Sequence, residues 1–144
     1  MKVRFKKLNP NAKIPTYATP QSAGADLYAV ADKDIIIPPH KTVFVTTGLA
    51  IQIPDGYAGL VYARSGLASN NGLAPANKVG VIDSDYRGEA FVALHNHSET
   101  PQTVTDGQRI AQLVITPVLR AEFELGELSD TERGEGGFGS SGKF

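Results

Sequence analysis

Short runs of β-branched, aliphatic and aromatic residues, separated by turn-forming residues, are the feature that most limits the fold of this chain. Pro38-Pro39 and Pro54-Asp55-Gly56 are turn signals that close two of these runs. About ten short strands at such a spacing are typical of a sandwich, a barrel or a jelly roll. The sequence therefore predicts an all-β fold, a jelly-roll-like β-sandwich or barrel. The clearest predicted strands are residues 3–5, 35–37, 42–47, 49–53, 57–62, 79–82, 90–95, 102–105 and 110–118.

One segment has the signals of a helix, and it is short. Ser65 is the expected N-cap, residues 66–71 would form the helix, and Gly72 would end it in the left-handed conformation. About two turns is the limit for this helix.

Composition and charge exclude several classes of protein. The chain contains no Cys, which rules out a disulfide scaffold, a zinc–thiolate site and a cysteine nucleophile. A net charge of −1 argues against a broad nucleic-acid surface, although a single triphosphate needs only a few Arg residues and a divalent ion. The sequence has neither the apolar run of a signal peptide near its start nor a stretch long enough to span a membrane. We therefore expect a soluble cytoplasmic protein without nucleic-acid or membrane partners, a nuclear or organellar location staying open for a eukaryotic source.

Three polar segments lie within the strand pattern, and each has a chemical and a structural interpretation. Residues 64–66 could hold phosphate at the start of the helix, or they could simply cap it. Asp83 and Asp85 lie two residues apart in a polar turn, where one of them could activate water. Asp26 begins another predicted strand as a lone acidic residue, which is also common in ordinary turns. Taken alone, none of the three identifies a function.

The C-terminal segment, residues 133–144, is rich in Gly and ends the β pattern. Its composition cannot supply a core, so it is either a flexible end or a lid. For a lid, the Gly residues would let backbone N–H groups turn toward an anion, Arg133 would add positive charge, and Phe138 would offer an aromatic face to a base. We therefore expect one domain, 1–144, with a β core over 1–132 and a mobile lid over 133–144.

Taken together and in order, these segments resemble the five motifs of the trimeric dUTPase family. Ala63 stands where the second motif usually begins with Pro, and this change removes no functional group. The resemblance covers essentially the whole chain, and the third and fifth motifs are the specific signals. The five segments are residues 23–27, 63–68, 80–88, 107–113 and 133–142.

The resemblance implies a homotrimer whose active sites lie between subunits, with dUTP as the substrate. It implies that water attacks the α-phosphorus, with Asp83 as general base. Mg²⁺ is the implied cofactor, held by the triphosphate and by waters, with Asp26 acting through a water. The products would be dUMP and pyrophosphate. This reaction would keep uracil out of DNA and supply dUMP for dTMP synthesis.

The resemblance also implies a role for each substrate-binding residue. The phosphates would be held by Arg64, Ser65 and Gly66 and, from the lid, by Arg133. Gln112 would orient the α-phosphate or the attacking water, and Gly139 of the lid would also bind the substrate. The base would be recognised by Asn77, Gly80, Val81, Ile82 and Phe91, and it would stack on Phe138. Tyr86 would lie under the deoxyribose and exclude a 2′-hydroxyl.

Two alternatives remain open at this point. A dCTP deaminase-like enzyme would share the fold but would need an acid placed at the base. A catalytically silent β-sandwich that serves as a binding or regulatory module would be expected to have lost Asp83, Arg64 or the tail, and the sequence retains all three.

Overall fold

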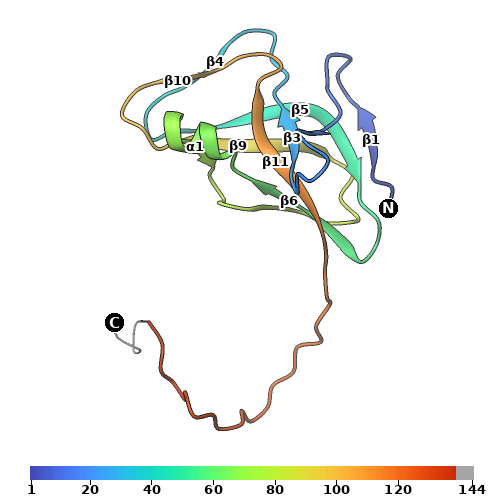
Figure 1. Cartoon of the computed structure of the whole chain (residues 1–144), viewed down its shortest axis with the longest axis vertical. Helices are drawn as coiled ribbons and strands as arrows, with labels where there is room; N and C mark the ends of the chain where they lie inside the picture. Colours follow the sequence, from blue (N-terminus) through green and yellow to red (C-terminus); the bar gives the residue numbers. More distant parts are fainter. Residues whose placement is uncertain (139–144) are drawn as a thin grey trace.

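The computed structural model describes residues 1–138 of the 144-residue chain. Regular structure in this part is almost entirely β, with one short helix, α1 (Ser65–Asn71) (Figure 1). This confirms the predicted all-β fold. The strands are β1 (Arg4–Lys7), β2 (Thr16–Tyr17), β3 (Ala25–Tyr28), β4 (Ile35–Ile37), β5 (Thr42–Gln52), β6 (Tyr57–Tyr62), β7 (Leu73–Pro75), β8 (Gly80–Ile82), β9 (Glu89–Asn96), β10 (Gln102–Val104) and β11 (Arg109–Pro117).

Two main antiparallel sheets share one core. One sheet has the strand order β1-β5-β9-β7, the other has the order β2-β3-β11-β6-β8, and β10 pairs separately with β4. Val45 and Leu94 from the first sheet lie in the same buried cluster as Leu27, Val61 and Leu113 from the second. Because both sheets bury their apolar faces in a common core, the arrangement is a sandwich of the predicted kind.

The longest strand, β5, corrects one detail of the predicted fold. Residues 42–47 and 49–53 were expected to form two strands, but β5 continues through Gly48. Gly48 adopts a φ of +65°, and the pairing of β5 with β9 shifts register around it. A Cβ atom at this position would lie 2.9 Å from the side chain of Asn9, so the close packing also requires glycine. The glycine therefore produces a bulge within one strand and does not end it.

Helix α1 confirms its predicted end and corrects its predicted start. Gly72 adopts the left-handed conformation with a φ of 65° and ends the helix as expected. The N-cap position, however, is occupied by Arg64, and Ser65 is already the first helical residue. No side chain caps the helix there, and the Arg64 guanidinium instead donates to Asp26. The residue before the helix therefore joins it to β3.

After β11 the chain continues as an arm, residues 118–138, which contains neither helix nor strand. Figure 1 shows the arm running away from the sandwich. Four of its large apolar side chains, Leu119, Phe123, Leu125 and Leu128, are between 93 % and 105 % exposed. The core of this chain therefore does not cover the apolar side chains of the arm.

The predicted lid is only partly described by the structure. Arg133 lies in the arm, where its Nε donates to the carbonyl of Gly136 at 2.8 Å. Phe138 is fully exposed at the end of the described chain. Gly139, which is predicted to bind the substrate, lies outside the described residues.

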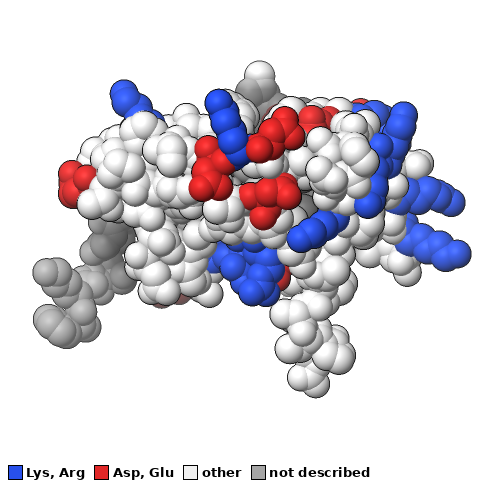
Figure 2. Space-filling model, turned by 90° about the horizontal axis from the view of Figure 1, so that it is seen from above, with Lys and Arg blue, Asp and Glu red and all other residues white. Residues whose placement is uncertain are grey.

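The surface of the molecule carries charges of both signs. Figure 2 shows a group of Asp and Glu near the middle of one face, with Lys and Arg gathered mainly toward one edge. Neither sign covers the whole face, in keeping with a net charge of −1. Among the described residues, no helix is long and apolar enough to cross a membrane.

Candidate active site

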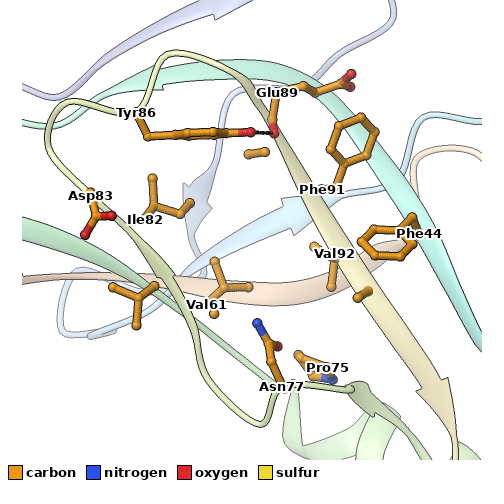
Figure 3. A pocket seen from close by; sticks show the side chains of 14 residues that line it. Phe44, Val61, Pro75, Asn77, Ile82, Asp83, Tyr86, Glu89, Phe91 and Val92 are labelled. Carbon is orange, nitrogen blue, oxygen red and sulfur yellow. Dashed lines mark hydrogen bonds between the residues drawn. The ribbon is translucent and has the colours of Figure 1, made fainter.

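A cleft of about 310 Å³ opens between β8, β9 and the neighbouring strands (Figure 3). Its volume lies within the range of small-molecule sites, and its lining mixes apolar side chains with a few polar groups. Most of it comes from one stretch of chain, residues 75–93. The lining residues are Phe44, Val61, Pro75, Asn77, Gly80, Val81, Ile82, Asp83, Tyr86, Glu89, Ala90, Phe91, Val92 and Ala93.

The cleft brings together every residue that the sequence assigned to the base and the sugar within the core, together with the predicted general base. These residues are Asn77, Gly80, Val81, Ile82, Asp83, Tyr86 and Phe91. They belong to the turn after β7, to β8, to the turn after β8, and to β9. Their grouping around one cavity follows from antiparallel pairing, which folds this stretch back on itself.

The turn after β7 presents Asn77 to the cleft. It is tight, because Lys78 adopts a φ of 65° and the N–H of Val79 donates to the carbonyl of Asn77 at 2.7 Å. Figure 3 shows the Asn77 amide pointing toward Val61 across the cleft. A Cβ atom at Gly80 would lie 3.3 Å from Asn77 Nδ2, so glycine at 80 leaves space for the amide. The amide has both a donor and an acceptor to offer to a ligand.

The turn from Asp83 to Gly88 is closed by an arginine. Arg87 donates from one terminal nitrogen to the carbonyls of Ser84 at 2.7 Å and Tyr86 at 2.9 Å. The N–H of Tyr86 donates to the carbonyl of Asp83 at 3.2 Å. These bonds hold the turn while the Asp83 side chain stays exposed at the edge of the cleft.

A second group of predicted site residues surrounds Asp26. Arg64 Nε lies 2.8 Å from one carboxylate oxygen of Asp26, and Arg109 donates to the other at 3.2 Å. The Asp26 side chain is only 9 % exposed, whereas those of Arg64 and Arg109 are 26 % and 50 % exposed. A buried carboxylate thus holds two partly exposed guanidinium groups, and both retain free N–H donors. Such a pair is suited to bind phosphate oxygens.

Gln112 lies beside this group. It is the pairing partner of Asp26 across β11 and β3 and of Tyr62 across β11 and β6. A Cβ atom at Gly24 would lie 2.5 Å from Gln112 Oε1, so the glycine at 24 makes room for the amide. The first, second and fourth segments singled out in the sequence therefore converge on one region.

This second region has its own cleft, of about 550 Å³, next to the start of α1. Arg64, Gly66 and Arg109 line it, and Ser65 lies exposed at the first position of the helix. In the described part of the chain, this cleft shares no lining residue with the one around Tyr86. The single chain therefore does not unite the residues expected to bind the base with those expected to bind the phosphates.

Several cleft residues were missed by the sequence analysis. Phe44 is 73 % exposed and lies on β5 opposite Ala93, so that it is a diagonal neighbour of Phe91. Glu89 contributes its carbonyl to the site, which no side-chain pattern could reveal. Arg109, by contrast, belongs to the fourth segment, and a charged residue within that segment could have indicated a role.

The described residues offer no protein cage for a metal ion. No group of three or more His, Asp or Glu is placed to hold one among residues 1–138. Asp26 uses both carboxylate oxygens for arginines, so direct ligation would have to displace one of them. This donor set fits a metal held mainly by a phosphate ligand and by waters, with the protein contacting it through water.

The fold and the clefts define a small β-sandwich protein that has one largely apolar cleft and a second cleft beside a pair of arginines. Comparison with known proteins identifies its family. The family model for dUTPase matches residues 10–142.

Relatives and solved structures agree with this match. A deoxyuridine 5'-triphosphate nucleotidohydrolase of Desulfitobacterium hafniense is 51 % identical over 99 % of this chain and 95 % of its own length. One of Nautilia profundicola is also 51 % identical and covers 99 % of this chain and 100 % of its own. The Staphylococcus bacteriophage 80alpha dUTPase, solved with dUpNHpp as a G164S mutant, is 29 % identical, with a TM-score of 0.84 over 98 % of both chains. The chain therefore belongs to the dUTPase family, which confirms the resemblance based on the five segments.

Proposed function

We propose that this protein is a dUTP diphosphatase that hydrolyses dUTP to dUMP and pyrophosphate. The observation that carries the proposal is the cleft at β8 and β9, because its lining includes the residues expected to bind uracil and deoxyribose together with Asp83. The relatives named as deoxyuridine 5'-triphosphate nucleotidohydrolases support the same substrate. Removing dUTP would keep uracil out of DNA and supply dUMP for dTMP synthesis.

The base would be selected by the turn and strand from Asn77 to Ile82. The Asn77 amide and the backbone groups near Gly80 can pair with the edge of uracil. Cytosine reverses the donor and acceptor pattern at position 4 and would leave buried groups unpaired, which costs enough to reject it. Phe91 would close one side of the slot, and Phe138 of the lid would stack on the exposed face of the base.

Catalysis would begin with a water molecule placed between Asp83 and the α-phosphorus. As the water oxygen forms its bond to phosphorus, its proton passes to the Asp83 carboxylate. The bond from the α-phosphorus to the bridging oxygen breaks on the opposite side, and pyrophosphate leaves with that oxygen. Asp83 is exposed at the cleft edge, where it can meet a substrate phosphate.

The triphosphate would be held by the region around Asp26. Arg64, Ser65 and Gly66 would contact its oxygens, and Gln112 would orient the α-phosphate or the attacking water. Arg133 of the lid would reach the γ-phosphate. Mg²⁺, when bound to the triphosphate, would neutralise part of its charge. Asp26 would accept a hydrogen bond from one of the metal's waters while it holds Arg64 and Arg109.

A complete site would require three copies of the chain. A single nucleotide must touch both clefts, yet these clefts share no lining residue within the described chain. A homotrimer solves this if the phosphate-binding residues of one copy face the Tyr86 cleft of a second and the arm of the third closes over both. The exposed apolar side chains of the arm support this arrangement, because a second copy would cover them.

The test compares pyrophosphate release from dUTP, dTTP, dCTP and UTP, each with and without Mg²⁺. We expect strong preference for dUTP and faster turnover with Mg²⁺. Release of ammonia from dCTP would instead identify a deaminase of the same fold. Binding of dUTP without turnover would identify a silent module.

A further inference from the structure

Tyr86 is held by hydrogen bonds at both ends, at its side-chain hydroxyl and at its backbone N–H. Its hydroxyl donates to the carbonyl of Glu89 at 2.9 Å, and its backbone N–H donates to the carbonyl of Asp83 at 3.2 Å. Figure 3 shows the ring edge-on, with its hydroxyl directed at Glu89. The residue is still 43 % exposed, which leaves ring surface free for a ligand. The ring is therefore fixed in place without being buried.

Gly88 creates the space in which this ring lies. A Cβ atom on Gly88 would be 2.4 Å from the Tyr86 hydroxyl oxygen, 2.6 Å from Cζ and 3.0 Å from Cε2. Unlike Gly72 and Gly107, Gly88 does not adopt a left-handed φ, so its backbone would accept another residue. The requirement for glycine thus comes from the tyrosine ring and not from the turn. Any side chain at 88 would have to displace the ring, because the atoms that a Cβ atom would meet there all belong to the Tyr86 side chain.

Glu89, whose backbone carbonyl accepts the hydrogen bond from the Tyr86 hydroxyl, is itself held to β5 by its side chain. Its side-chain carboxylate accepts hydrogen bonds from the N–H of Gly48, at 2.9 Å, and from the hydroxyl of Thr46. Both partners lie at the bulge of β5, and Glu89 also pairs with Ala50 across the two strands. The carbonyl that receives the Tyr86 hydroxyl is therefore anchored to the longest strand of the sandwich.

We infer that Gly88 and Glu89 set the discrimination between deoxyribonucleotides and ribonucleotides by fixing the position of the Tyr86 ring. This inference rests on the proposed function, in which that ring lies under the deoxyribose. A ring that could tilt away by the length of one C–O bond would admit a 2′-hydroxyl. Gly88 and Glu89 are positioning residues, because they act through Tyr86 and not on the nucleotide.

The test measures kcat/KM for dUTP and for UTP and takes their ratio for each variant. Gly88→Ala should lower the ratio about tenfold or more, since excluding one added hydroxyl by shape alone is worth roughly 10- to 100-fold. Gly126→Ala is the matched control, because a Cβ atom there meets nothing within 4 Å. It should leave the ratio unchanged.

A double substitution separates displacement of the ring from general disruption of the turn. In a Tyr86→Ala background the new methyl group at 88 has no ring to displace, so adding Gly88→Ala should not change the ratio further. If the second substitution lowered the ratio as much as it does in the wild type, the effect would not pass through Tyr86 and the inference would be wrong.

Tyr86→Phe tests the Glu89 contact even if Gly88→Ala does not fold. It keeps the ring and removes one hydrogen bond, so the ratio should fall about fivefold, the equivalent of about 1 kcal/mol. A selective wild type whose ratio is unmoved by both Gly88→Ala and Tyr86→Phe would overturn this inference alone. A wild type that releases no pyrophosphate from dUTP would overturn the proposed function instead.

Discussion

The cleft around Tyr86 and the C-terminal arm differ in how far a single chain completes them. The cleft is formed mainly by residues 75–93, and hydrogen bonds and the core hold its walls in place. The arm leaves Leu119, Phe123 and Leu125 almost fully exposed and lies apart from the sandwich. The difference indicates that one chain arranges the walls of the cleft by itself, whereas under the proposed function the arm would depend on a neighbouring copy.

The largest effect should come from Asp83, the proposed general base. Asp83→Asn should reduce kcat by about 10²- to 10⁴-fold, because the amide cannot accept the proton of the attacking water. Binding of the analogue dUpNHpp should persist, since the walls of the cleft are unchanged. Asp85→Asn is the control, as Asp85 lines a different cleft together with Asp55. Equal losses in both variants would show that the turn as a whole, and not Asp83, is required.

The arm side of the comparison is tested by Phe123→Ser. If a second copy covers this side chain, the substitution should weaken assembly by about 1.5–3 kcal/mol per buried phenyl ring. Sedimentation analysis across a dilution series should then show dissociation at higher protein concentration than in the wild type. Glu124→Ser changes the neighbouring exposed residue and should have little effect. A distribution of species that is identical for wild type and Phe123→Ser would mean that the arm does not dock through this ring.

Substitution of Phe138 in the lid should have a somewhat smaller effect than substitution of Phe123 in the arm. Phe138→Ala removes the proposed stacking partner of uracil and should raise KM for dUTP by an amount equivalent to about 1–3 kcal/mol. Phe138→Trp should restore the affinity, because an indole ring also stacks. The midpoint of thermal unfolding should not change in either variant, since Phe138 is fully exposed. An unchanged KM in Phe138→Ala would mean that Phe138 does not stack on the base.

The sequence could predict the features that depend on local residue patterns, but not those that depend on contacts between distant residues. Alternating apolar runs and turn residues specify strands locally, and Gly72 carries its own conformational signal, so the β fold and the end of the helix were predictable. Gly48 was read as a break between two strands because a bulge and a turn use the same residue. Arg64 stands at the N-cap position expected for Ser65, and its pairing with Asp26 joins residues far apart in sequence.

The site likewise contains residues that motifs predicted and residues that only the structure reveals. The motifs, taken in their order along the chain, singled out Asn77, residues 80–83, Tyr86 and Phe91, and the structure places these residues around one cleft. Phe44 and the carbonyl of Glu89 were not predictable, because their part in the site arises from strand register and backbone position. Register depends on the whole sheet, so no short pattern contains it.

The smallest expected effect is on stability and concerns His97, which follows β9 at the end away from the cleft. It tests whether the stability of the core depends on one chain alone. Partial desolvation, followed by the positive charges of His95, Lys78 and His40, lowers the pKa of His97 below its ordinary value of 6.5. As pH falls through about 6.5, the unfolded chain takes up a proton at His97 before the folded chain does, so acid lowers the free energy of unfolding. Above that pH the residue is neutral in both states and contributes nothing.

His97→Asn should therefore lose less stability than the wild type between pH 7 and pH 5, by less than about 0.5 kcal/mol, because the side chain is exposed and water screens its neighbours. Urea unfolding at several pH values measures this difference, which should stay constant above pH 7. The His97 contribution arises within one chain and should not vary with protein concentration, in contrast to the effect of Phe123→Ser. A His97 effect that grew on dilution would place this end of β9 at the contact between copies and would remove the distinction between a complete core and an incomplete arm.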